Sequence, residues 1–356
     1  MRSDIASHWH GAVPHRFWRV VMCETGKRDG ERKYVQLRIR TQCSGSNVDQ
    51  PPPQAICCSL PAGIYEVMMS AEDILQKWKA IDGLAGAIGS SFPADAFLTL
   101  LLAGILDIAQ RAENPIRGNL CAAGLRELVG HILHSLAPDE RVTACSWYVS
   151  VPNTVGPTRA QRVAFIVHAG LTDDFVQDEL EIDLRDTVRP LTSTMAALNK
   201  ATHVRPHSVL YEEAEIQRLL AAAFGGVLRL LDAANDCRIA VNNALEMHVD
   251  EALFSKLIDE TIQDLDELST HTSVEGHQID EIRLEALNDQ EVVFVVQGQV
   301  HVRLQYGSGS DLRRGDGVVQ PASYPYAAEL RASAADPTNF CAPSVRVKVD
   351  NSSFYQ

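Results

Sequence analysis

The stretch that decides the fold is Asn114–Glu140, which reads NPIRGNLCAAGLRELVGHILHSLAPDE. Its apolar side chains recur at offsets of 4, 7, 8, 11 and 15 residues from the first of them. They are Cys121, Leu125, Leu128, Val129, Ile132 and Leu136. This is the spacing of one face of an α-helix, so it predicts an amphipathic helix with that face buried in a core.

Three polar side chains of this helix lie off the apolar stripe: Arg126, His131 and His134. Metal-free RNA cleavage needs a proton acceptor near the 2′-hydroxyl group and a cation near the phosphate, and His and Arg are the residue types that supply them. The three residues are therefore candidate catalytic residues. The alternative is a solvated arginine and a partly buried histidine, because 25 Arg and 12 His in this chain give roughly one Arg-x4-His pair by chance.

Arg126 and His131 lie about 140° apart on an ideal helix, at about 100° per residue over five steps. The two side chains therefore do not meet on one straight helix. A shared site requires a bend or a second protomer, which favours a homodimer with paired sites.

The composition is that of an ordinary globular protein, with 356 residues, 46% hydrophobic and 22% charged. The net charge of −14 is unevenly divided: residues 1–69 carry nine Lys and Arg against six Asp and Glu, so the remainder is −17 (−14 minus +3). An acidic body weighs against a nucleic-acid-binding module, although a small basic cleft would still serve.

Metal, cofactor and membrane sites are not expected. The eight cysteines include no C-x2-C pair, so no zinc site is predicted and no cofactor is implied. The longest apolar run, Phe97–Ala109, contains Thr99 and Asp107 and is too short to cross a bilayer, so it is predicted to be a buried helix. No secretory signal is recognisable, and a cytoplasmic location is expected.

Residues 1–69 differ in character from the rest, with four of the eight cysteines and three consecutive prolines at 51–53. They are expected to be either an idiosyncratic, poorly structured extension or a spurious one. In the second case translation begins at Met68 or Met69, where Ser70 is placed to cap a helix.

Residues 70–271 show helical periodicity and are predicted to form one helical domain. Helices are predicted at 71–84, 93–113, within 114–140, and at 186–203, 212–234 and 236–268. Residues 158–169 fit either a helix or a short strand, because they are too uniformly apolar for periodicity to decide. The acidic face of the last helix is expected to be solvated.

Near Ser273 the period changes to two, which predicts a small antiparallel β domain over residues 273–356. The segment 291–306 is predicted to form two strands joined at or near Gly298, in a small antiparallel meander or open barrel of five strands. The loop GSGSDLRRGDG, residues 307–317, is expected to be a hairpin loop, with a phosphate or cation site as the alternative. The predicted fold class is therefore α+β, a mainly helical domain followed by a small antiparallel β domain.

Five further residues are candidates for binding a phosphate-bearing substrate. They are Arg117, Arg159, Arg162, His203 and Arg205. The alternatives are exposed arginines that open a helix, and cations that lie favourably at the end of a helix dipole.

Four phrases occur in a characteristic order: SLAPDERVTACSWYV, GPTRAQRVAFIVHAGL, LNKATHVRP and GSGSDLRRGDG. In this order the chain, from Ala71 to about Val349, resembles the predicted pPIWI-associating nuclease family of bacterial conflict proteins. The phrase RELVGH is similar to the Arg-x4-His motif of metal-independent ribonucleases of the HEPN superfamily. The resemblance implies a nuclease.

The leading hypothesis is a nuclease of a bacterial defence system that cleaves RNA without a metal, using a HEPN-like Arg/His site, together with a defence-system partner protein. The rival is a non-catalytic adaptor or sensor that assembles other defence components. A metal-dependent nuclease is the third option, but the chain has only seven lysines and no D-x(n)-[DE]-x-K element on its predicted strands.

Overall fold

The computed structural model describes residues 19–22, 37–40, 62–206 and 208–355. The chain divides into two units, residues 1–61 and 62–356. In the first, strands β1 (Arg19–Met22) and β2 (Leu37–Arg40) pair antiparallel. Most of the expected 1–69 extension otherwise lies outside the described residues.

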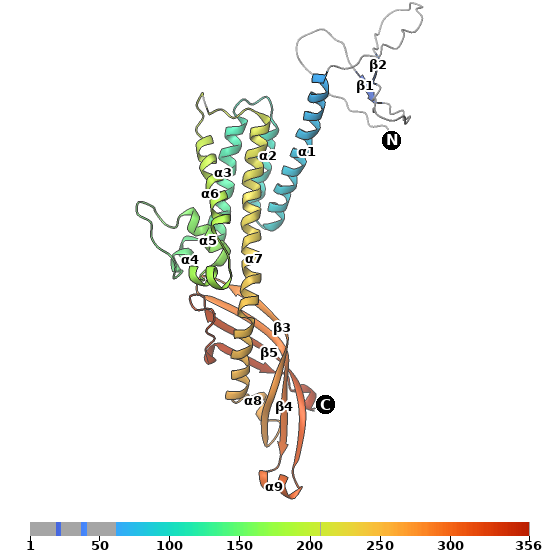
Figure 1. The fold of residues 1–356 in the computed structure, drawn as a ribbon, viewed down its shortest axis with the longest axis vertical. Coiled ribbons are helices and arrows are strands. Elements are labelled where there is room, and N and C mark those ends of the chain that lie inside the picture. The colour runs from blue at the N-terminus through green and yellow to red at the C-terminus, as the bar shows by residue number, and fades with distance from the viewer. Residues whose placement is uncertain (1–18, 23–36, 41–61, 207, 356) are drawn as a thin grey trace, which may run out of the picture. The chain divides into compact units, whose positions relative to one another are not determined.

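The second unit contains a group of helices followed by an antiparallel sheet, as predicted (Figure 1). Its helices are α1 Ala62–Ser91, α2 Ala96–Gln110, α3 Arg117–Leu136, α4 Asp139–Ala144, α5 Arg159–His168, α6 Arg185–Ala201, α7 Glu213–Asp259 and α8 Gln263–Asp266, with one π-helical turn, η1, at Phe175–Glu179. Since α1 begins at Ala62, Ser70 lies inside a helix and does not cap one. No Gly or Pro stands between Ile64 and Ser70 to interrupt it.

Helix α3 lies at the centre of the helical part and packs against α2, α5, α6 and α7. Five of its predicted core residues are at most 1% exposed: Cys121, Leu125, Leu128, Val129 and Ile132. The helix predicted from the 114–140 stretch is confirmed. Helix α5 resolves the ambiguity at 158–169, because Thr158 and Gln161 form a reciprocal capping box at its start.

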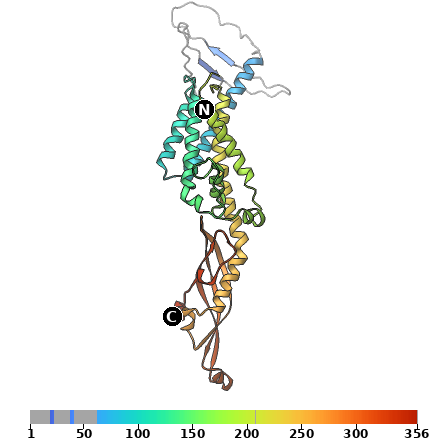
Figure 2. The ribbon, with the colours of Figure 1, turned by 90° about the vertical axis from the view of Figure 1, so that its left-hand side faces the viewer.

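Helix α7 is a single helix of 47 residues, about 70 Å long at about 1.5 Å per residue. The prediction of two separate helices at 212–234 and 236–268 is therefore wrong, because no break divides them near residue 235. The predicted break at Asn235 contains neither Gly nor Pro, and Ala234 and Cys237 on either side are buried, so packing continues through it. The upper half of α7 packs among the helices and its lower half lies along the sheet (Figures 1 and 2).

In the second unit, the described strands form a four-stranded meander in the order β3-β4-β5-β6. They are β3 His271–Leu287, β4 Glu291–Tyr306, β5 Val318–Ser333 and β6 Val345–Val349, with short helical turns α9 Gly309–Arg314, η2 Ala342–Ser344 and η3 Ser352–Tyr355 beside them. Alternate residues of β4 and β5 are buried, from Val292 to Leu304 and from Tyr324 to Ala332, and this face packs on α7.

The prediction that two strands join at Gly298 is wrong, because β4 runs through it without a break. The chain turns instead at residues 288–290, where the Asn288 side-chain oxygen accepts hydrogen bonds from the backbone N–H groups of Gln290 and Glu291. The lack of a side chain at Gly298 allows Tyr326 and the Gln278 backbone to approach closely. A Cβ atom there would lie 2.7 Å from the Tyr326 hydroxyl oxygen and closer still to the Gln278 carbonyl oxygen.

The 307–317 loop joins β4 to β5, as expected for a hairpin, but it contains a helical turn. Ser308 and Asp311 form a capping box at the start of α9, and Gly315, with a φ of 83°, ends it in the left-handed conformation. The Asp311 carboxylate is occupied by Ser308 and Arg314.

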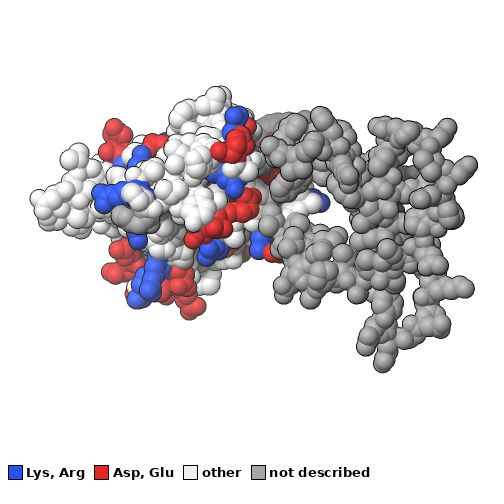
Figure 3. All heavy atoms as spheres, turned by 90° about the horizontal axis from the view of Figure 1, so that it is seen from above, with Lys and Arg blue, Asp and Glu red and all other residues white. Residues whose placement is uncertain are grey.

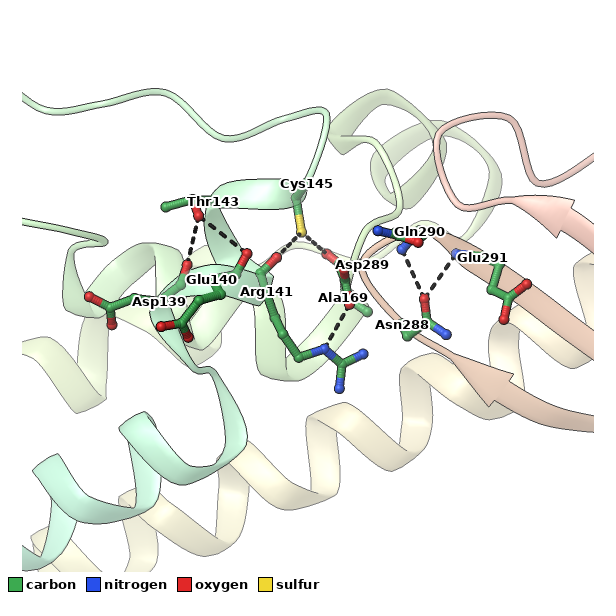
Figure 4. A network of polar contacts seen from close by, with 10 residues as sticks. All are labelled: Asp139, Glu140, Arg141, Thr143, Cys145, Ala169, Asn288, Asp289, Gln290 and Glu291. Atoms are coloured by element: carbon green, nitrogen blue, oxygen red, sulfur yellow. Dashed lines mark hydrogen bonds and ion pairs between the residues drawn. The ribbon is translucent and has the colours of Figure 1, made fainter.

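The helical part and the sheet meet at the turn between β3 and β4 (Figure 4). Arg141 Nε donates to the Asp289 carboxylate at 2.7 Å, and Gly170 N donates to the Asn288 carbonyl at 3.0 Å. Buried Cys145 contacts the carbonyls of Arg141 and Ala169 beside them. The turn is thus fixed to helix α4 by a side chain and to the segment that follows α5 by a backbone hydrogen bond.

Candidate functional site

Helix α2 starts at an aspartate that also contacts α3. Asp95 is the N-cap of α2, and its Oδ1 accepts a hydrogen bond from Leu98 N at 2.8 Å. Its second oxygen, Oδ2, lies 2.6 Å from Nε2 of His131. The backbone N–H of Leu98 and then the His131 hydrogen bond lower the pKa of Asp95, so this carboxyl group remains ionised at neutral pH.

His131 is partly exposed beside this carboxylate, with 27% of its side chain accessible. The Phe97 ring contacts it edge to face, with ring centroids 5.0 Å apart. An ionised Asp95 accepts a hydrogen bond, so it places the imidazole proton on Nε2 and leaves a lone pair on Nδ1. A shallow hollow of about 430 Å³ is lined by residues 92–96, which include Asp95. The arrangement is an accessible histidine with a fixed tautomer.

The other two candidate catalytic residues are not joined to this pair. Arg126 forms an ion pair with its neighbour Glu127, with Nη2 and Oε1 2.6 Å apart. His134 is exposed in the last turn of α3, where its Nδ1 donates to the Gly130 carbonyl at 2.8 Å. Within one chain, His131 therefore contacts Asp95, whereas Arg126 pairs with Glu127.

Two of the five candidate substrate-binding residues lie in the interior. Arg117 is 6% exposed and donates to the Ala109 carbonyl at 2.9 Å and to the Glu213 carboxylate. Arg162 is 4% exposed and donates to the Ala137 carbonyl and to Asp139. The Arg162 guanidinium group is the main cause of a lowered pKa at Asp139. In the folded chain both guanidinium groups hold helices together.

The remaining three, Arg159, His203 and Arg205, are exposed. His203 and Arg205 lie in the loop between α6 and α7, which buried Asn119 holds in place. The Asn119 amide donates to the carbonyls of Ala201 and Ser208 at 2.7 and 2.9 Å, and its oxygen accepts from Leu210 N at 3.1 Å. The start of α3 therefore fixes the backbone of the loop and leaves the side chains of His203 and Arg205 accessible.

Sequence reasoning missed Asp95 and Asn119. Asp95 carried a local signal, because an aspartate directly before an apolar run is a typical N-cap. Its contact with His131, 36 residues away, carried no such signal. Asn119 is a lone amide on the buried side of a helix, and only its tertiary partners reveal its role.

The charges on the surface seen from above alternate in sign (Figure 3). Lys and Arg side chains are interspersed with Asp and Glu there, so no extended basic surface is present on the described part of this face. Within the described residues, no group of three or more His, Cys, Asp or Glu is arranged to hold a metal ion. None of the described helices combines the length and apolarity needed to cross a membrane.

Comparison with known proteins gives a consistent result over most of the chain. No curated protein and no solved structure matches it. Two family models match, both described as predicted pPIWI-associating nuclease, one over residues 90–226 and the other over residues 234–355. The first spans the Asp95–His131 pair and the second spans the sheet with the lower half of α7. The chain therefore belongs to the predicted pPIWI-associating nuclease family.

Proposed function

We propose that the protein cleaves RNA without a metal ion, with His131 as the proton-transfer group and Asp95 as the residue that positions it. The observation that carries this proposal is the 2.6 Å contact between His131 Nε2 and Asp95 Oδ2 at an accessible surface. A carboxylate–imidazole pair fixes the tautomer and stabilises the imidazolium ion that forms during proton transfer.

In the proposed reaction, Nδ1 of His131 accepts the proton of a ribose 2′-hydroxyl group. The 2′-oxygen then forms a bond to the adjacent phosphorus atom, and the bond from phosphorus to the 5′-oxygen breaks. The leaving 5′-oxygen takes a proton from water or from a second histidine, and His134, one helical turn away on α3, is the candidate. Proton transfer by one positioned group contributes on the order of a hundred- to ten-thousand-fold in rate.

The developing negative charge on the phosphate requires a cation. Arg126 is assigned this role in a homodimer, where Arg126 of one protomer lies across the interface from His131 of the other. The proposal is supported by the angular separation of about 140°, which keeps the two apart within one chain. In that complex the phosphate replaces Glu127 as the partner of Arg126.

Substrate is held by the exposed side chains of Arg159, His203 and Arg205, which we assign to contacts with the phosphate backbone away from the cleavage point. A cytoplasmic location and a role in bacterial defence, with a partner protein that controls the activity, complete the proposal.

The test compares purified parent protein with His131→Ala and Asp95→Ser on labelled single-stranded RNA, with and without EDTA. Serine retains the N-cap of α2 but is too short to reach His131, so it separates positioning from helix stability. His131→Ala is expected to abolish cleavage, and Asp95→Ser to lower its rate and change its pH profile. His301→Ala, on the far sheet, is the matched control. Undiminished cleavage by His131→Ala would rule out this site.

The second candidate function is a non-catalytic adaptor. It is favoured by the Arg126–Glu127 ion pair, which occupies the only arginine of the motif, and by the net charge of −14. Absence of cleavage by the parent protein on every RNA tested, alone and with the proteins encoded beside it, would support this function.

A further inference from the structure

One side of the lower half of α7, beside strand β3, carries large apolar side chains that are partly or mostly exposed to solvent. Met247, Phe254 and Ile258 are 71%, 40% and 51% exposed. At about 100° per residue the three lie within about 40° of one another around the helix. The other side of the same segment buries Leu245 and Val249. This half of α7 is therefore apolar on two sides, and the sheet covers one of them.

The middle of this exposed stripe is held rigidly. The Phe254 ring stacks on His277 of β3, with centroids 5.6 Å apart and an interplanar angle of 18°. His277 Nε2 lies 3.2 Å from an Asp250 carboxylate oxygen, and its Nδ1 lies 3.1 Å from the Tyr326 hydroxyl oxygen. An exposed aromatic ring fixed in this way loses little conformational entropy when a partner covers it.

Acidic side chains flank the stripe, and together they are called its acidic frame. The acidic residues of this segment are Glu246, Asp250, Glu251, Asp259 and Glu260. Its one cation, Lys256, donates to Glu260 and to the Ala342 carbonyl. Beside the stripe is a hollow of about 290 Å³ between α7 and residues 338–342, and three of these acids outnumber Lys256 in its lining.

These features decide between possible occupants. A second copy of the chain placed on the same face would bring two acidic frames together, at a cost in like-charge repulsion. Nucleic acid and anionic lipid surfaces are repelled for the same reason. A helix with an apolar face flanked by Lys and Arg matches both features, because its apolar side covers the stripe while a basic side chain enters the acid-lined hollow.

We propose that the α7 stripe is the docking site for a basic amphipathic helix of a partner protein. The stripe belongs to the region matched by the second family model, and it lies outside the site assigned to His131. The proposal does not depend on catalysis, because it concerns only recognition.

The test uses the full chain and a defined probe, an 18-residue fluorescent peptide of Leu and Lys with leucines at spacings of three and four. Fluorescence anisotropy measures its dissociation constant for the parent, for Met247→Lys and for Leu100→Lys. Leu100 on α2 is 67% exposed and provides a matched control for an apolar-to-lysine change elsewhere. A second peptide of the same composition, scrambled to remove the apolar face, controls for charge alone. Glu251→Lys reverses one charge of the acidic frame and so tests its contribution to peptide binding.

The peptide is expected to bind saturably, more weakly as salt rises, and about tenfold or more weakly to Met247→Lys and Glu251→Lys. Leu100→Lys should bind as the parent does. Equal binding of the ordered and scrambled peptides would overturn the proposal, as would equal weakening by Leu100→Lys. Failure of the parent to bind also overturns it, and a self-association that Met247→Lys abolishes would identify a second copy as the occupant.

Discussion

Gly298→Ala is expected to destabilise the sheet, although it adds only one methyl group on an extended strand. The added carbon would lie 2.7 Å from the Tyr326 hydroxyl oxygen and against the Gln278 carbonyl oxygen, so the Tyr326 ring must move. Overpacking of this kind costs about 1–3 kcal/mol. Displacing Tyr326 also breaks its hydrogen bond with buried His277, at a cost of about 1 kcal/mol.

A smaller effect acts in the opposite direction. Replacing glycine with alanine restricts the unfolded chain and stabilises the fold by about 0.4–1 kcal/mol. The net loss in the free energy of unfolding is therefore about 1–4 kcal/mol. Gly276→Ala, on neighbouring strand β3, is the matched control, since a Cβ there meets nothing within 4 Å. It is expected to be neutral or slightly stabilising.

Urea unfolding followed by far-ultraviolet circular dichroism measures both variants. In the background of Tyr326→Phe the cost of Gly298→Ala should fall by at least the hydrogen-bond contribution, because both that bond and the crowding hydroxyl oxygen are already absent. A Gly298→Ala protein within about 0.5 kcal/mol of the parent, or equal losses at both glycines, would refute the packing argument.

Three further predictions concern buried groups. Burial lowers the pKa of fully buried His168. Its contribution to stability is therefore present above its unfolded pKa of about 6.5 and is lost as the pH falls through that value toward the lower folded pKa. The urea midpoints of the parent and His168→Gln should differ more at pH 8 than at pH 5, and parallel pH profiles would contradict this. Arg117→Ala removes the charged partner of Glu213, which keeps the hydrogen bond from Trp78 Nε1, and leaves the Ala109 carbonyl without its side-chain donor. It should cost about 1–3 kcal/mol in urea unfolding, and a loss under about 0.5 kcal/mol would show that the pair contributes little. Burial raises the pKa of the Cys121 thiol to about 11 and that of the Cys145 thiol to about 12. Iodoacetamide at pH 8 should therefore label exposed Cys341 far faster than either, as measured by peptide mass spectrometry. Comparable labelling rates in the folded protein would be inconsistent with the burial of Cys121 and Cys145.

The sequence predicted those features that depend on local periodicity. Helix α3 and the change to a period of two near Ser273 followed from the spacing of apolar residues, because one face of each element is buried. Gly298 misled the prediction, because a glycine within a strand indicates either a turn or a close neighbour, and only the packing of Tyr326 decides which. The length of α7 was underestimated because no local signal distinguishes a capped end from a polar turn that continues.

The candidate site was predictable in part. His131 was selected from residue type and position off the apolar stripe, but its partner depends on how α2 lies against α3. The burial of Arg117 and Arg162 was not predictable either. An arginine at the start of a helix has the same local sequence signature whether it contacts solvent or carbonyl groups of neighbouring helices.

The boundary between the two matched family segments, residues 226 and 234, falls inside α7, where the helix is continuous. The number of residues between the two segments therefore fixes an angle as well as a distance. Each residue added there would rotate the sheet by about 100° about the helix axis and shift it by about 1.5 Å. A single insertion would pull Asp289 away from Arg141, whereas a change of seven residues would nearly restore the rotation and alter only the spacing. The number of residues in helix α7 therefore sets the rotation of the sheet about the helix axis relative to the helical part.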